Sequence, residues 1–206
     1  MNTQLKDGIL KSLDVHLSAD GFQFQKRSQE WRKVATESEV FKIHLNFGKV
    51  VINPSVWYYS DRLAALWRDS GLVSSDSSPE SAQFGQMLGA LSGSVYDGDT
   101  RGISDLIYSD IKRLGLPYLE RLSDFGEVVR LLQSTNAKDW PIFGRDRRAY
   151  SLLIMLAESG EIQQAFSLIP SLELGLQSAA SVKPSFADFT RWFTHHYETN
   201  AAQPKR

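Results

Sequence analysis

Two groups of side chains in this sequence have the types that could do chemistry. The first is a histidine in a polar row. In the stretch FKIHLNF, His44 alternates with Lys42 and Asn46, so the three side chains fall on one face of a predicted strand. A general base needs a partner within hydrogen-bond reach, and the neighbouring sequence supplies none. The pattern therefore predicts that His44 is an ordinary member of a surface row and that no residue here is catalytic.

The second group is the basic run RDRR. Arg145, Arg147 and Arg148 make it the densest basic stretch of the chain. Guanidinium groups pair with carboxylates and phosphates, so the cluster could hold an anionic ligand or an acidic partner. The alternative is a solvated face beside the start of a helix, as most charge runs are.

Other candidate groups do not have the spacing of a metal site. His195 and His196 are adjacent, so on a helix they point about 100° apart and do not share a metal as an i, i+4 pair can. The YDGDT stretch has Tyr108 where a calcium loop starting at Asp97 needs its glutamate. The chain has no cysteine, which removes thiolate catalysis, disulfides and cysteine-bound zinc. We expect no metal and no cofactor.

No phosphate loop, dinucleotide fingerprint or Gly-x-Ser-x-Gly elbow occurs. We therefore expect a binding protein and not an enzyme. The 23 basic and 24 acidic residues give a net charge of -1, which argues against nucleic acid as a partner. Charges interrupt the N-terminal apolar residues, and no apolar run is long enough to span a membrane. A cytoplasmic location without a membrane partner is the expectation.

An antiparallel meander positions the histidine row. Leu5, Ile9, Leu13 and Leu17 make one stripe of a helix over residues 3–19. Alternating stretches then predict strands at 22–28, 30–36, 40–48 and 50–59. Phe41, Ile43, Leu45 and Phe47 form the face that helices must cover. Pro54 cannot donate to a ladder and so predicts a bulge or an edge-facing position.

The rest of the chain is predicted to be mostly helical. Residues 84–99 fit a further strand or hairpin better than a helix, because Gly85 and Gly89 disfavour a helix. A helix from Ile103 is expected to end at Gly115, with Pro117 just beyond. Later helices include a pair around Gly160. The fold class is α+β: a four- to five-stranded antiparallel meander packed against helices, with an α-helical C-terminal part. We expect an α+β core domain at 1–135 and a helical extension packed on it at 136–206.

The outward face of the meander has the composition of a protein interface. If no second layer covers it, alternation makes six side chains point outwards together: Lys42, His44, Asn46, Asn53, Trp57 and Tyr59. Aromatic residues mixed with polar ones are typical of protein contacts. One alternative is that Trp57 and Tyr59 are buried under helices, and another is that a bulge at Pro54 turns them to the opposite face.

The order of these elements resembles a bacterial family of small α+β proteins known only as a domain of unknown function. The resemblance covers roughly residues 5–133. It depends most on Gly21-Phe22 after the first helix and on Leu116-Pro117-Tyr118-Leu119-Glu120. Some similar proteins look like immunity partners of secreted toxins. The resemblance therefore implies a non-enzymatic protein that binds a protein partner, such as a toxin, and neutralises it by steric occlusion.

A ligand-binding protein or enzyme that uses His44 or the Arg145, Arg147 and Arg148 cluster is the alternative. Its mark would be a deep pocket that joins one of these groups to convergent polar side chains.

Overall fold

The computed structural model describes residues 2–73, 83–98, 101–142, 144–176 and 185–201. The chain divides into two compact units. The first contains residues up to Asp61 together with 83–123. The second contains the helices from Arg62 on and from Asp124 on. The predicted α+β class is confirmed, since an antiparallel sheet is followed by a helical C-terminal part.

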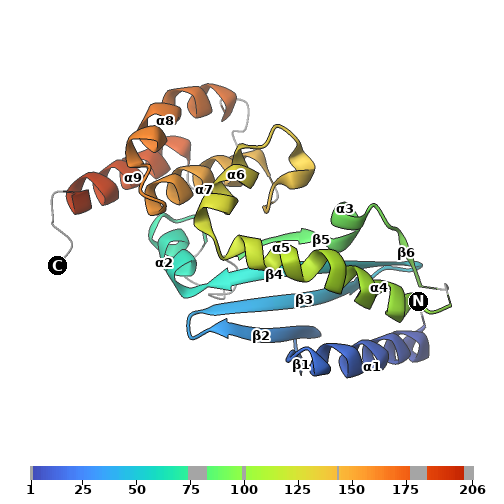
Figure 1. Ribbon diagram of the computed structural model, residues 1–206. Coiled ribbons are helices and arrows are strands. Elements are labelled where there is room, and N and C mark those ends of the chain that lie inside the picture. Colours follow the sequence, from blue (N-terminus) through green and yellow to red (C-terminus); the bar gives the residue numbers. More distant parts are fainter. Residues whose placement is uncertain (1, 74–82, 99–100, 143, 177–184, 202–206) are drawn as a thin grey trace. The chain divides into compact units, whose positions relative to one another are not determined.

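The described residues of the first unit form a six-stranded antiparallel sheet (Figure 1). Its strands are β1 (Gln23–Gln25), β2 (Glu30–Thr36), β3 (Glu39–Phe47), β4 (Val51–Ser60), β5 (Gln83–Met87) and β6 (Tyr96–Asp97). They follow the order β1-β2-β3-β4-β5, and β6 also pairs with β4. The ambiguous region 84–99 thus holds two strands. Between them is the short helix α3 (Leu88–Ser92), which ends at Gly93 with φ 73°.

Pro54 is paired on one side of β4 and unpaired on the other. It faces Leu45 in β3, and the β3–β4 register runs without a shift. On the other side of β4, β6 pairs with Val51 and Ile52, and β5 pairs with Ser55–Tyr59. Pro54 falls between these two partners, where no backbone N–H is required. Of the two predicted explanations, the structure therefore selects the edge-facing position.

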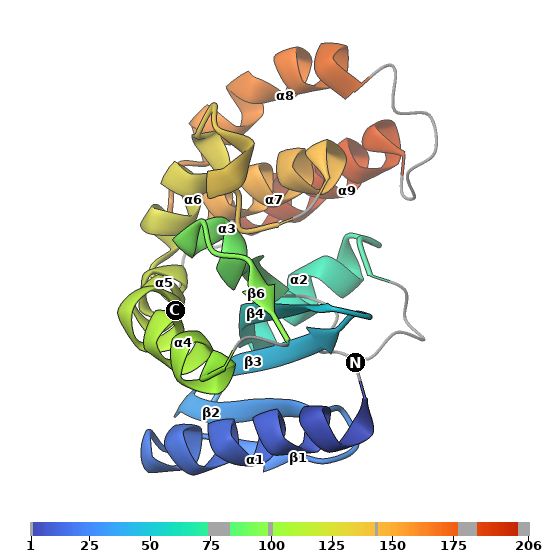
Figure 2. The same cartoon turned by 90° about the vertical axis from the view of Figure 1, so that its right-hand side faces the viewer.

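Helices cover one face of this sheet, the predicted core face. They are α1 (Thr3–Ala19), α4 (Ile103–Asp110), a π-helix η2 (Ile111–Gly115) and α5 (Leu116–Leu122), and Figures 1 and 2 show α4 and α5 running along the sheet. Ile43 and Leu45 are fully buried. The Trp31 indole, on the same face, donates a hydrogen bond to Asp14 of α1 at 2.9 Å. Gly115 lies so near the sheet that a Cβ there would be 3.0 Å from Val56 Cγ1.

The prediction that a helix ends at Gly115 is wrong. The α4 helix continues through the π-helix η2 into α5, where Pro117 occupies the first turn. Proline has no N–H to donate to the carbonyl of Arg113, and its ring would clash with that carbonyl in a regular helix. A wider turn relieves both problems, and in it the N–H of Leu116 bonds to the carbonyl of Ile111.

The second unit is built around one central helix, α7 (Arg145–Glu158). Its residues from Ala149 to Leu156 are all buried, and a helix buried on every side must have neighbours all round. These neighbours include α6 (Phe125–Gln133), α8 (Ile162–Leu176) and α9 (Phe186–Ala201). The expected pair around Gly160 is α7 and α8. The unit also takes in α2 (Asp61–Asp69) from Arg62 on, so it starts before the expected boundary at 135/136.

Candidate functional site

The strongest candidate site is a pocket on the face of the sheet that the helices of the first unit leave uncovered. We call it the sheet pocket. Its volume is about 360 Å³, and it is lined by Glu30, His44, Asn46, Asn53, Ser55, Trp57 and Met87. Four adjacent strands supply these residues.

The antiparallel register brings these side chains together. His44 faces Glu30 of β2 on one side and Ser55 of β4 on the other. Asn46 faces Asn53 in the same way. Directly opposed residues of neighbouring strands share a face of the sheet, so these polar groups converge. The arrangement explains why four of the six predicted outward side chains, His44, Asn46, Asn53 and Trp57, line one pocket.

Trp57 owes its position to a glycine on the next strand. Gly85 of β5 is its register partner. A Cβ on Gly85 would lie 2.4 Å from indole atom Cε3 and 2.3 Å from the carbonyl oxygen of Val56. The indole therefore lies across the space that any other residue would fill. Its Nε1–H donates to Ser55 Oγ at 2.8 Å, which fixes the ring along its own strand.

Several polar side chains of the sheet pocket are available to a ligand. Glu30 forms an ion pair with Arg32, and the Ser55 hydroxyl donates to the carbonyl of His44 at 3.4 Å. The side chains of His44, Asn46 and Asn53, by contrast, make no hydrogen bond to any described residue. Imidazole and amide groups both donate and accept hydrogen bonds. The site can therefore recognise polar atoms of either kind.

Lys42 and Tyr59 lie on the same face but are withdrawn from its surface. Lys42 is 3% exposed and Tyr59 is 9% exposed. The Lys42 ammonium lies 5.1 Å from the centre of the Tyr59 ring, within range of a cation–π contact. The Tyr59 hydroxyl donates to Asp61 at 2.8 Å. Both residues therefore offer little surface to a partner.

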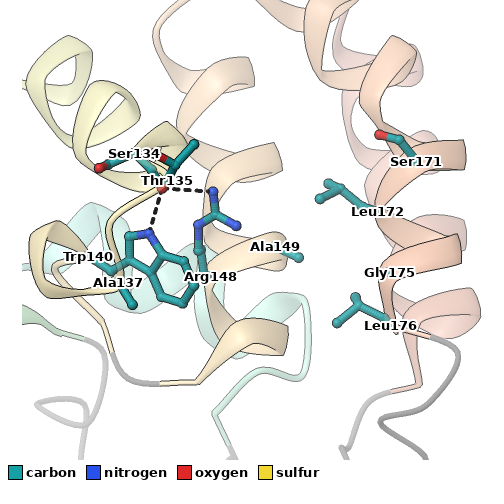
Figure 3. A pocket seen from close by; sticks show the side chains of 10 residues that line it. All are labelled: Ser134, Thr135, Ala137, Trp140, Arg148, Ala149, Ser171, Leu172, Gly175 and Leu176. Carbon is teal, nitrogen blue, oxygen red and sulfur yellow. Dashed lines mark hydrogen bonds between the residues drawn. The ribbon is translucent and has the colours of Figure 1, made fainter.

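The residues of the predicted arginine cluster differ in their exposure to solvent. Arg147 is exposed, and the side chain of Arg145 is outside the described part. Arg148 is half-buried, and its Nε donates to the carbonyl of Leu132 at 2.6 Å. Burial lowers the pKa of the Arg148 guanidinium from its usual value. Of the three arginines, Arg148 lines a pocket of about 480 Å³ in the helical unit (Figure 3).

Sequence reasoning missed three of the lining residues. Ser55 lies two residues before Trp57, and alternation would have placed it on the same face. Glu30 is placed among the lining residues by the pairing of β2 with β3, and Met87 by the pairing of β4 with β5. Register across strands has no local signal in a single sequence, so these two residues could not have been found.

Within the described part of the chain, no group of three histidine or carboxylate residues is placed to hold a metal ion. None of the described helices is long and apolar enough to cross a membrane. Comparisons with protein-family models, with curated proteins and with solved structures find no match to this chain.

Proposed function

We propose that this protein is a non-enzymatic binding protein and that the sheet pocket receives a polar side chain or loop of a protein partner. The observation that carries the proposal is the position of Trp57. It is half-buried and lines the pocket together with polar groups, three of which, His44, Asn46 and Asn53, make no hydrogen bond to described residues. Tryptophan is among the residues that contribute most to protein interfaces.

Rigidity of the site supports a binding role. The lining residues lie on paired strands and not on loops, and Trp57 is fixed by its hydrogen bond to Ser55. A preformed site loses little conformational freedom when a partner binds, so more of the contact energy appears as affinity. Steric occlusion needs a tight complex of this kind and no chemistry.

Residues 5–133 resemble a family known only as a domain of unknown function, and some similar small proteins look like immunity partners of secreted toxins, which suggests the class of partner. We propose that the partner is a secreted bacterial toxin and that it is bound in the cytoplasm, since a chain without cysteine fits a reducing compartment. Occupation of the sheet pocket by a loop of the toxin would keep the toxin from its own substrate.

The test is to measure binding to a co-encoded toxin, meaning a toxin encoded by the gene next to the gene of this protein. Asn46 lines the pocket and is exposed, so the longer side chain of Asn46→Arg should block the pocket without disturbing the core. We expect the dissociation constant to rise by at least about tenfold. Gln4→Arg adds the same charge on an exposed position of α1 and should leave affinity unchanged. The proposal fails if the partner is not bound, or if both variants bind it equally well.

A small-molecule ligand is the second candidate, and the size of the pocket favours it. The volume of about 360 Å³ lies within the range of roughly 300–1,000 Å³ typical of ligand sites. A fragment screen followed by NMR shifts of His44, Asn46 and Asn53 distinguishes the two candidates. Saturable binding of a small polar compound, abolished by Asn46→Arg, would favour this reading over the protein partner.

A further inference from the structure

The helical unit contains a second pocket, separate from the sheet pocket. Its volume is about 480 Å³. One wall comes from α7 and the segment after α6, and the other comes from α8 (Figure 3). The lining residues are Ser134, Thr135, Ala137, Trp140, Arg148, Ala149, Ser171, Leu172, Gly175 and Leu176.

The first wall carries one cation with unused donors. Arg148 Nε and one terminal nitrogen donate to the carbonyls of Leu132 and Ser134, at 2.6 and 3.4 Å. The guanidinium also lies over the indole of Trp140, 4.3 Å from its ring centre. A guanidinium has five N–H groups, so others stay available. Within the described part of the chain, no carboxylate pairs with Arg148.

This arrangement holds the cation in one place. The Trp140 indole donates to the same Ser134 carbonyl at 2.8 Å, so ring and guanidinium are tied to one point (Figure 3). A stacked and hydrogen-bonded arginine has little rotamer freedom left to lose when it binds an anion.

The second wall is mostly apolar, and the hydroxyl of its one serine, Ser171, donates to the carbonyl of Leu168 at 2.8 Å. Leu172 and Leu176 are one helical turn apart on α8, and both point towards the α7 wall (Figure 3). Gly175 lies between them on the same face. A Cβ added at Gly175 would meet no atom within 4 Å, so the space in front of it is open. Ala149 of α7, on the first wall, adds an apolar side chain to the lining.

We propose that this second pocket binds a small amphipathic carboxylate. Its carboxylate would bond to the remaining donors of Arg148, and its hydrocarbon part would lie against Leu172 and Leu176. A single half-buried guanidinium matches one carboxylate, and burial strengthens such a charge-assisted bond. A doubly charged phosphate would call for a second cation, and Arg148 is the one cationic side chain among the lining residues. The inference does not depend on the function proposed for the sheet pocket.

Octanoate is a suitable probe, with titration calorimetry on the full chain at neutral pH. We expect one site and an affinity at least about tenfold higher than that for octan-1-ol, which has the same chain without charge. Octyl phosphate should bind no more tightly than octanoate, and octylammonium should not bind. Equal affinity for octanoate and octan-1-ol would overturn the role of Arg148.

Two variants complete the test. Arg148→Gln should remove the preference for octanoate over octan-1-ol. Because Arg148 also bonds to the end of α6, this variant could lose its fold, and Gly175→Trp gives an independent check. The indole should fill the open space and abolish binding, whereas Gln163→Trp, on an exposed position of the same helix, should not. Unchanged octanoate binding in folded Gly175→Trp would overturn the proposed location.

Discussion

At the scale of single residues, the sheet pocket depends on one missing side chain. Gly85 leaves the space in which the Trp57 indole lies, and this indole forms part of the pocket lining. The glycine is not needed for a left-handed backbone conformation, since its φ is not positive. It is needed because backbone and ring atoms already occupy the position of a Cβ.

Gly85→Ala should therefore lower the free energy of unfolding by about 1–3 kcal/mol, the usual cost of forcing extra atoms into a packed site. The control is Gly8→Ala in α1, where a Cβ would meet nothing within 4 Å. That change should stabilise the protein by roughly 0.5–1 kcal/mol, because alanine favours a helix over glycine. Chemical denaturation measures both, and equal effects would contradict the packing argument.

A buried carboxylate on α4 makes stability depend on pH. Asp110 is 3% exposed and accepts hydrogen bonds from Tyr96 at 2.9 Å and from Arg113 at 2.7 Å. Burial alone would raise the pKa of Asp110, but the bonds from Arg113 and Tyr96 bring this pKa below its usual value. Burial, with Asp110 beside the ring, raises the pKa of Tyr96 to about 12.

A lowered carboxyl pKa stabilises the fold above the unfolded pKa of about 4, and this contribution is lost as the pH falls through the folded value. Asp110→Asn should therefore be less stable than the native chain at pH 6, and the difference should shrink towards pH 2. Urea denaturation across this pH range measures the difference. A gap that stays constant with pH would mean that the charge of Asp110 is not involved.

At the scale of elements, a polar contact holds three helices of the second unit together. Glu158, at the end of α7, forms an ion pair with Arg62 of α2 and accepts a hydrogen bond from Tyr197 of α9 at 2.9 Å. The Glu158 side chain is only 9% exposed, whereas that of Arg62 is 61% exposed. Burial raises the pKa of Tyr197, and the neighbouring Glu158 raises it further. The tyrosine therefore stays a neutral donor.

Arg62→Ala should leave the Glu158 charge largely without compensation. We expect the free energy of unfolding to fall by about 1–2 kcal/mol, less than for a fully buried pair because Arg62 is well exposed. Arg191→Ala is the matched control, since its ion pair with Asp188 is open to solvent. That change should cost no more than about 0.5 kcal/mol. Thermal unfolding followed by circular dichroism compares the two variants.

At the scale of the whole molecule, the two units are not two consecutive halves of the sequence. The helical unit includes α2 from Arg62 on, which precedes β5 of the sheet in the sequence. It also includes α6, which contacts α7 and whose C-terminal carbonyls accept hydrogen bonds from Arg148. A boundary at 135/136 separates α6 from the helix against which it packs.

A fragment of residues 136–206 should consequently fold poorly by itself. It lacks α6 and so exposes the apolar side of α7 that α6 covers. Extension to residues 124–206 restores α6 and should give a sharper and higher thermal transition, because cooperative unfolding needs a closed core. Circular dichroism and amide dispersion in NMR compare the fragments. Identical transitions would show that α6 contributes nothing to this unit.

The local pattern of the sequence was enough to predict most elements and the two faces of the meander. Alternation in 40–48 and the stripe of four leucine and isoleucine residues in α1 are set by the geometry of one strand or one helix. The side-chain period is 2 in a strand and 3.6 in a helix, whatever lies nearby. Because the apolar set of each strand indicates its core side, alternation places His44 and Asn46 of one strand and Trp57 of the next on the outward face.

Only the tertiary structure decided how deep each of these side chains lies. Lys42 has the same alternation as His44 and yet is buried beside Tyr59, and Arg148 belongs to a basic run and yet bonds to the end of α6. The tertiary structure was also needed to show that Glu30 and Met87 line the sheet pocket. The same holds for the continuation of α4 past Gly115. Periodicity is a local property of the chain, whereas burial, register and hydrogen-bond partners depend on segments far away in sequence.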